Sequence, residues 1–241
     1  MLIKLGYSFE AWKKGRMESA YHWNTDQVPH ILIAGITGGS KTVTAQMIVN
    51  QLLNNNDTEL FICDFKAGND WNEKIARYAA YSDCDRLLRL FYESFLSTIE
   101  KKAMGNHYLL FDEFTSFALS KDSKGFKEIM AMISHIAFMG RSFGYHLIFI
   151  GQQMNSKVLD TAIREQFGIK IYMGSTISTE SATMLFPNSE INKGIHLPRF
   201  CGYISMPERE LEIIQIPFLS EPQKLIKLLE NKGQNRRRFS D

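Results

Sequence analysis

Short apolar runs alternate along this chain with longer stretches in which apolar residues recur every three or four positions. The runs have the length of strands buried on both faces, and the stretches have the spacing of helices that bury one face. The predicted strands are 1–5, an apolar run from 31, 59–64, 107–113, 145–150, 169–173, 201–206 and 210–216. The predicted helices are 43–49, 70–80, 85–104, 125–143, 159–167 and 221–231.

This alternation predicts an α/β fold with a mainly parallel sheet and helices on both of its faces. The end of the chain differs, because the last two strands flank Pro207-Glu208-Arg209 and are expected to form a β-hairpin at the sheet edge, followed by a helix. We expect residues 1–28 to be a short β-rich lead-in packed on the core, 29–232 to be the main domain, and 233–241 to be a basic, disordered tail.

Composition adds few constraints. The 241 residues are enough for one large α/β domain, and the formal net charge of +2 is too small to imply a polyanionic partner. The three cysteines, Cys63, Cys84 and Cys201, lack metal-site spacing, so we expect reduced thiols in a cytoplasmic protein. We see neither a transmembrane run nor a signal-peptide pattern, so any membrane anchor is expected on a partner or a part absent from this sequence.

The stretch with the clearest chemistry is Gly35-Ile36-Thr37-Gly38-Gly39-Ser40-Lys41-Thr42, which leads from an apolar run into a helical pattern. Backbone N–H groups of such a glycine-rich turn, together with a helix N-terminus, cradle phosphate groups. Lys41 would reach the outer phosphates, and the Thr42 hydroxyl would bind a bridging magnesium ion. Ser40 stands where the usual pattern has glycine, and a positive φ there would be strained. We therefore predict a site for ATP and Mg2+ at residues Gly35 to Val43, with the lead-in beside it.

An acidic pair provides the second half of this site. Asp112 and Glu113 end an apolar strand, and the carboxyl ends of parallel strands form the edge where ligands of open α/β sheets bind. Asp112 would lie beside Thr42 and hold magnesium, and Glu113 would act as general base for the attacking water. An acidic pair after a strand can also be a helix cap, but the phosphate-loop pattern upstream favours the nucleotide site.

Gln152 follows the strand predicted between the loop strand and the acidic strand. An amide at this place can orient the attacking water and sense the γ-phosphate, and an ordinary loop glutamine is an equally good explanation. Together with the extra strand, these features indicate a RecA-like ATPase core.

Several stretches now resemble one family. Residues Pro29-His30-Ile31-Leu32-Ile33-Ala34-Gly35-Ile36-Thr37-Gly38 resemble the P-H-L-L-I-A-G-A-T-G segment of the FtsK/SpoIIIE DNA translocases, within the HerA-like group of hexameric motors. Further matches occur in the same order. Asp64-Phe65-Lys66 resembles the family's D-P-K, residues 140–147 resemble A-R-A-A-G-I-H-L, and residues 162–167 resemble I-K-A-N-F. Leu197-Pro198, taken together with Gly202-Tyr203, resembles the P-G-R-G turn. The resemblance covers roughly residues 29 to 218.

This resemblance implies a homohexameric ring with each ATP lying between neighbouring subunits. By position, Arg141 would be the arginine finger that enters the next subunit's site, and Arg164 would be a second trans-acting cation. Arg141 could instead cap a helix C-terminus. The implied activity is ATP-driven translocation of double-stranded DNA, as in plasmid or mobile-element transfer.

The chain departs from the family in three places. Ser40 replaces the loop glycine; Gln152-Gln153-Met154 replaces Gln-Arg-Pro, whose arginine faces DNA; and the membrane segments and C-terminal winged helix have no counterpart in this sequence. Sequence-specific loading on DNA would then need a membrane-anchored or DNA-loading partner.

Two other functions remain open. Type VII secretion ATPases share the predicted architecture and engage a polypeptide, which agrees with the missing pore arginine. Alternatively, Ser40 has inactivated the loop and the chain is an assembly subunit that binds nucleotide weakly or not at all. The intact Lys41, Thr42, Asp112 and Glu113 argue against that loss.

Overall fold

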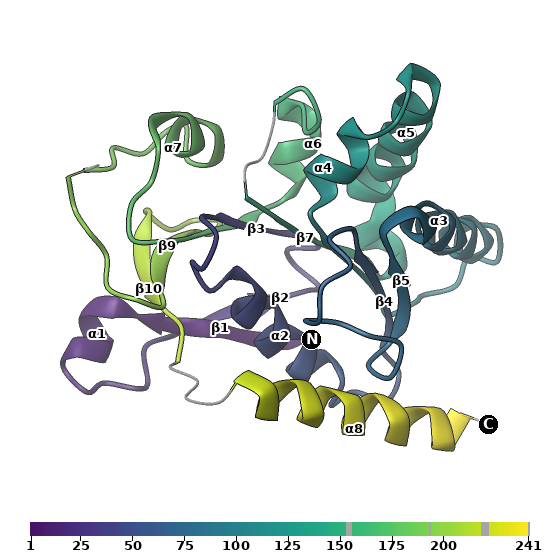
Figure 1. The fold of residues 1–241 in the computed structure, drawn as a ribbon, viewed down its shortest axis with the longest axis horizontal. Helices are drawn as coiled ribbons and strands as arrows, with labels where there is room; N and C mark the ends of the chain where they lie inside the picture. Colours follow the sequence, from purple (N-terminus) through teal and green to yellow (C-terminus); the bar gives the residue numbers. More distant parts are fainter. Residues whose placement is uncertain (153–155, 193, 218–221, 241) are drawn as a thin grey trace.

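The computed structural model describes residues 1–152, 156–192, 194–217 and 222–240, with the backbone alone for 222 and 235–240. Within these residues, one sheet has the strand order β2-β1-β10-β9-β8-β3-β7-β6-β4-β5 (Figure 1). Its strands are β1 (Leu2–Ser8), β2 (Ala20–Asn24), β3 (Ile31–Gly35), β4 (Glu59–Asp64), β5 (Arg77–Ala80), β6 (His107–Asp112), β7 (Tyr145–Gly151), β8 (Ile169–Met173), β9 (Cys201–Ser205) and β10 (Glu212–Gln215). The helices are α1 (Phe9–Lys13), α2 (Lys41–Leu52), α3 (Cys84–Glu100), α4 (Phe114–Leu119), α5 (Ser123–Met139), α6 (Thr161–Gln166), α7 (Thr179–Leu185) and α8 (Pro222–Ser240), with short 3-10 helices η1 (Tyr81–Asp83) and η2 (Gly140–Phe143).

The central strands are parallel, as the alternation of strands and helices predicted. β3 pairs in parallel with β7 on one side and β8 on the other, and β6 pairs in parallel with β7 and β4. One strand therefore separates the loop strand β3 from the acidic strand β6. The predicted α/β, RecA-like arrangement with an extra strand is confirmed.

Two hydrophobic cores lie on the two faces of the sheet. Successive strand residues point to opposite faces, so Phe61 and Leu109 pack with α3 and α5, whereas Ile62 and Leu110 pack with α2 and α8. Figure 1 shows α3, α4, α5 and α6 on one side of the sheet and α2 and α8 on the other. The central strands β3, β6 and β7 are buried in nearly every position because both faces of the sheet are covered there.

The predicted C-terminal hairpin forms, but its expected place at the sheet edge is wrong. β9 pairs with β8 and β10 pairs with β1, so the hairpin lies inside the sheet and β2 forms the edge. β1 and β2 belong to the same sheet as the core. The hairpin was predicted at the edge because local sequence does not reveal that β1 pairs with β10, about 200 positions later in the chain.

The helix predicted over 70–80 is wrong as well. Residues 77–80 form β5, which pairs in parallel with β4, and 70–76 form turns. Trp71 and Ile75 are buried in the same core as α8. The backbone of residues 77–80 forms hydrogen bonds with β4, whose edge would otherwise be unpaired. These bonds stabilise the strand more than the weak helix propensity of this short segment stabilises a helix.

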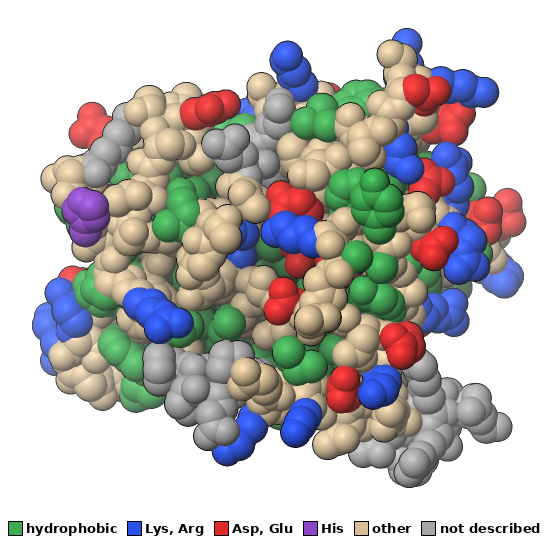
Figure 2. Space-filling model, in the orientation of Figure 1, with side chains coloured by type: hydrophobic (Ala, Val, Ile, Leu, Met, Phe, Trp, Pro, Cys, Tyr) green, Lys and Arg blue, Asp and Glu red, His purple; other side chains and the backbone are tan. Residues whose placement is uncertain are grey.

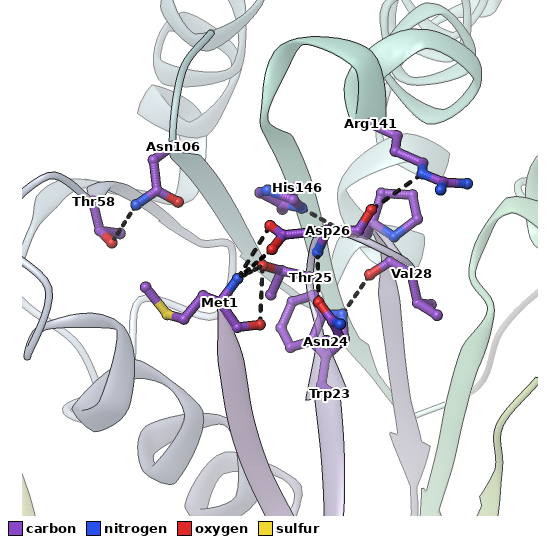
Figure 3. A network of polar contacts seen from close by, with 11 residues as sticks. Met1, Trp23, Asn24, Thr25, Asp26, Val28, Thr58, Asn106, Arg141 and His146 are labelled. Carbon is purple, nitrogen blue, oxygen red and sulfur yellow. Dashed lines mark hydrogen bonds and ion pairs between the residues drawn. The ribbon is translucent and has the colours of Figure 1, made fainter.

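The N-terminal lead-in meets the amino-terminal edge of the parallel strands. The Trp23 indole N–H donates to the Val28 carbonyl at 2.5 Å, the His146 Nδ1 lies 3.0 Å from the Pro29 carbonyl, and Arg141 Nε donates to the Asp26 carbonyl at 3.2 Å (Figure 3). Lys4 of β1 exchanges hydrogen bonds with Gln51, near the C-terminal end of α2. The lead-in thus contacts the end of α2 opposite the phosphate loop, and its predicted position beside the nucleotide pocket is wrong.

Helix α8 extends beyond the predicted end at Asn231. Its backbone is helical to Ser240, where we expected a disordered tail, and the side chains of Arg236 to Arg238 lie outside the described residues. Leu229 is fully buried, and Lys232 Nζ donates to the side-chain oxygens of Asn50 and Asn54 at 2.5 and 2.7 Å. These contacts attach α8 to α2, so the chain beyond 231 continues a helix that is already docked on the core.

Other features of the described chain agree with the sequence. All three cysteines are buried and free, as expected for reduced thiols. Among the described residues, none of the helices combines the length and apolar character that crossing a bilayer requires.

Candidate functional site

The phosphate-loop pattern forms a turn at the carboxyl end of β3. Gly35 ends the strand and α2 begins at Lys41. A Cβ atom added to Gly35 or Gly39 would lie 1.9 or 2.4 Å from the Met173 carbonyl oxygen of β8, so packing requires glycine at both positions. Gly38 has φ of 75°, a conformation that glycine adopts without strain.

Ser40 adopts the positive φ that was anticipated as a source of strain. Its φ is 74° and its ψ is 18°, in the left-handed region, and its side chain makes no capping hydrogen bond to α2. Its carbonyl accepts hydrogen bonds from the N–H of Thr44 at 3.0 Å and from the Thr44 hydroxyl at 2.9 Å. The loop therefore keeps its shape with serine at a strain of about 1 kcal/mol.

Replacing Ser40 by glycine is expected to stabilise the chain by roughly 0.5–1 kcal/mol, because glycine relieves the left-handed strain and no capping contact is lost. Thermal unfolding should show a rise in Tm of about 1–4 °C. Ser178→Gly is the matched control. Ser178 has φ of −70° and caps α7 by accepting from the Ser181 N–H, so its replacement should lower Tm slightly. An unchanged or lower Tm for Ser40→Gly contradicts the assignment of strain to this residue.

The Lys41 side chain folds back onto the phosphate loop. Its Nζ donates to the carbonyl oxygens of Gly35 and Ile36, both at 2.7 Å, and the residue is 6% exposed. Burial and the nearby Lys66 lower the pKa of Lys41, against the opposing effect of Glu113 and Asp112. The ammonium group thus lies against the first two residues of the loop, whose carbonyls are its partners, and near both predicted carboxylates.

Asp112 ends β6 on the face of the sheet that α2 covers. Tyr108 and Leu110 pack into the core that includes α2, and the two-residue period of a strand places Asp112 on the same face. Trp71 Nε1 donates to Asp112 Oδ2 at 3.1 Å. Burial raises the pKa of Asp112 to about 6, against the lowering effects of Lys66 and of the Trp71 hydrogen bond. A cation beside this buried carboxylate would stabilise its charged form.

The donor atoms of Thr42 and Asp112 fit Mg2+. Hydroxyl and carboxylate oxygens are its preferred ligands, and it commonly takes one or two protein ligands together with substrate phosphates and water. The described residues contain no cluster of three or more histidine, cysteine, aspartate or glutamate side chains that could hold a metal alone. In the predicted magnesium site, phosphate oxygens of a bound nucleotide and water would complete the coordination.

Glu113 is held by contacts on both carboxylate oxygens. Its Oε2 forms an ion pair with Lys66 Nζ at 2.6 Å, and its Oε1 accepts the backbone N–H of Gln152 at 3.1 Å. Its own N–H donates to the Ile150 carbonyl at 2.8 Å, and its φ is 65°. This strained turn between β6 and α4 orients the carboxylate toward the end of β7.

A cavity of about 980 Å³ opens beside the phosphate loop. The loop contributes Ile36 and Thr37, and Glu113, Lys66 and Gln152 line the same space. The opposite wall comes from α4 and from the segment that joins β8 to α7. Figure 2 shows acidic and basic side chains gathered near the middle of one face of the molecule. The beginning of the phosphate loop and the predicted base thus line one cavity.

The structure brings Gln152 into the site but leaves the two arginines outside it. Gln152 follows β7 and lines the cavity, whereas Gln153 and Met154 of the predicted pore segment lie outside the described residues. Arg141 precedes β7 and Arg164 lies shortly before β8, so both are toward the amino-terminal edge of parallel strands whose carboxyl ends meet the loop. Their predicted catalytic roles would require a second copy of the chain and stay predictions.

Sequence reasoning missed two contacts of the acidic pair. Lys66 was noted only as part of a family resemblance, and Trp71 was placed in a helix that does not exist. The register of β4 against β6 sets Asp64 opposite Asp112 and so brings Lys66 beside Glu113, and the sequence alone does not reveal this register. Trp71 lies in an irregular segment, and only tertiary packing places its indole on Asp112.

Comparison with known proteins supports the family resemblance. The FtsK domain-containing protein YdcQ of Bacillus subtilis (strain 168) is 27% identical over 187 residues, a match that covers 70% of this chain and 38% of that protein. The chain therefore spans well under half of this relative's length. The predicted resemblance to an FtsK/SpoIIIE-type motor domain is confirmed. A comparison with models of protein families gives no match.

Solved structures with the same fold include those of two further proteins. The pCW3 conjugation coupling protein TcpA, in its monomer form with ATPγS, has a TM-score of 0.74 at 18% identity, and the alignment covers 94% of this chain and 70% of that one. EssC (ATPases 2 and 3) from Geobacillus thermodenitrificans has a TM-score of 0.72 at 13% identity, covering 99% of this chain and 49% of that one. At these identities the likeness shows the fold.

Proposed function

This chain resembles an FtsK/SpoIIIE-type motor domain, and from this premise we propose that it is a magnesium-dependent ATPase that uses ATP hydrolysis to translocate double-stranded DNA. The observation that carries the proposal is the cavity lined both by Ile36 and Thr37 of the phosphate loop and by Glu113, with the Lys41 ammonium group bonded to the Ile36 carbonyl beside it. Such an arrangement matches phosphoryl transfer, in which positioning and charge stabilisation do most of the work.

Each residue has a defined part in hydrolysis. The loop N–H groups and the N-terminus of α2 bind the phosphates, and Lys41 leaves the Gly35 and Ile36 carbonyls to contact the outer phosphate oxygens. Glu113 accepts the proton of the attacking water, and Gln152 orients that water. Mg2+ held by Thr42 and Asp112 would offset the charge of the phosphates.

The proposed assembly is a homohexameric ring, and the cargo is double-stranded DNA of a plasmid or mobile element. In that ring, Arg141 and Arg164 would enter the site of a neighbouring copy, which agrees with their distance along the strands from the loop of their own chain. An arginine supplied in trans stabilises charge on the transferring phosphate and can change the rate by orders of magnitude. The proposed place of action is the cytoplasm, with a membrane-anchored or DNA-loading partner.

ATP hydrolysis by the purified chain is expected to rise severalfold, by about three- to tenfold, when duplex DNA is added, and the stimulation should weaken as salt increases because phosphate contacts release counterions. Phosphate release with duplex DNA, with heparin as a non-nucleic polyanion and without additive measures this. Mass measurement with ATP and duplex DNA tests the hexamer. Hydrolysis that is indifferent to DNA contradicts the proposed cargo.

A polypeptide is the second candidate cargo. The Gln152-Gln153-Met154 stretch has no arginine where the DNA translocases have one, and this observation favours a secretion-type ATPase. Adding an extended polypeptide in place of DNA in the same hydrolysis assay separates the two, because only the true cargo should stimulate.

Loss of nucleotide binding is the third candidate. Ser40 strains the loop and Lys41 bonds to loop carbonyls, and both features oppose phosphate binding. Calorimetric titration with ATP and magnesium separates this candidate from an active ATPase. An active motor must show saturable ATP binding, whereas a chain that has lost the site shows none.

A further inference from the structure

Lys66 is a partly exposed cation paired with a buried anion. Its side chain is 43% exposed, whereas that of its ion-pair partner Glu113 is 8% exposed. We propose that Lys66 senses the γ-phosphate: it holds Glu113 in an ion pair while the site lacks a triphosphate, and it moves to the γ-phosphate oxygens when ATP binds, which releases Glu113 to act as base. This inference rests on the ATPase function proposed above.

The geometry separates a rigid part from a movable part. Glu113 is fixed through its backbone bond to Ile150 and through the Gln152 N–H on Oε1. The chain just before Lys66 is fixed as well, because Phe65 stacks on Tyr81 with ring centroids 5.2 Å apart and its N–H donates to the Asp112 carbonyl. The four-carbon stem of Lys66 can therefore swing from a firm base while the glutamate stays in place.

The surrounding charges keep Lys66 protonated. Burial lowers its pKa, but the hydrogen bond and charge of Glu113, with Asp112 and Asp64, more than offset this effect and raise the pKa overall. Lys66 lines the same cavity as the loop residues Ile36 and Thr37. A terminal phosphate placed there carries more negative charge than one carboxylate, so it can compete for the ammonium group.

The exchange would couple substrate recognition to base activation. Glu113 Oε2 lies 2.6 Å from the Lys66 ammonium group and Oε1 accepts the Gln152 N–H, so while the ion pair lasts both carboxylate oxygens have other partners, with which the attacking water must compete. When Lys66 moves to the phosphate, the water oxygen can form its bond to the γ-phosphorus as the bond to the ADP oxygen breaks, and the water proton passes to Glu113. ADP has no γ-phosphate and leaves the ion pair intact.

The test compares binding of ATPγS and ADP, with magnesium, by calorimetry. Wild type is expected to prefer ATPγS, and Lys66→Met should remove about tenfold to hundredfold of that preference while ADP affinity stays within about twofold. Lys66→Arg should keep much of the preference because it keeps the charge. Lys127→Met, at an exposed lysine of α5, is the matched control and should behave as wild type.

Two results overturn the inference. If folded Lys66→Met keeps the wild-type preference, Lys66 does not sense the γ-phosphate, although the proposed ATPase function can stand. If wild type binds neither nucleotide, the proposed function fails and this inference fails with it. Lys66→Gln, which retains a polar side chain, replaces Lys66→Met if circular dichroism shows that the methionine variant is unfolded.

Discussion

Lys41→Ala is expected to reduce ATP affinity by about a hundredfold and to bring hydrolysis below detection. Bonds from a charged donor to phosphate are worth about 1.5–3 kcal/mol each, and the alanine variant loses them in the bound state. In the free chain Lys41 donates to the Gly35 and Ile36 carbonyls at 2.7 Å, so ATP must replace those bonds. The net effect is large because a desolvated ammonium gains more from the concentrated charge of a triphosphate than from two neutral carbonyls. Titration calorimetry and phosphate release measure both quantities.

A stability control is needed because Lys41 is buried. Lys41→Met keeps most of the aliphatic stem and should approach the Tm of wild type more closely than Lys41→Ala, yet it should be equally inactive. ATP hydrolysis by either variant at more than about a tenth of the wild-type rate contradicts the assignment of the loop as a catalytic phosphate site.

Glu113→Gln is expected to lower the hydrolysis rate by about 10²- to 10⁴-fold while ATP remains bound. Glutamine has nearly the same shape and can still accept the Gln152 N–H, but it does not take a proton from water. The ion pair with Lys66 is lost at the same time, so the variant should bind ATP at least as tightly as wild type. Single-turnover hydrolysis separates the chemical step from binding.

Glu128→Gln is the matched control for this change. Glu128 lies on α5 and pairs with Arg89 at 3.2 Å on the surface, where an ion pair contributes at most about 1 kcal/mol. Its hydrolysis rate should equal that of wild type. A Glu113→Gln variant that hydrolyses ATP at the wild-type rate would show that another group acts as base.

The parallel core of the fold was predictable because its signals are local. β4 and β8 have the bounds that the sequence predicted, Glu59–Asp64 and Ile169–Met173. A strand buried on both faces needs an almost unbroken apolar run, and the segments around it supply helix spacing and glycine turns. The prediction over 70–80 failed because β5 depends on an edge that β4 provides, and no residue within the segment encodes that partner.

The candidate site divides in the same way. The loop residues and the acidic pair are adjacent in sequence to the ends of their strands, so spacing alone predicted their presence. The ion pair of Lys66 with Glu113 and the hydrogen bond of Trp71 with Asp112 join segments 41 to 47 positions apart. Such contacts follow from the register of neighbouring strands and from packing.

The sequence by itself determined the α/β alternation, the order of the loop strand and the acidic strand, and the residues Gly35 to Thr42, Asp112 and Glu113. These features depend on apolar periodicity and on short motifs, which act within one element. Only the tertiary structure decided that the hairpin lies inside the sheet and that Ser40 adopts φ of 74°. It also decided that Lys41 donates to backbone carbonyls and that Lys66 forms an ion pair with Glu113. The physical reason is that charges and backbone groups choose partners by distance in space, and strand pairing brings together groups that are far apart along the chain.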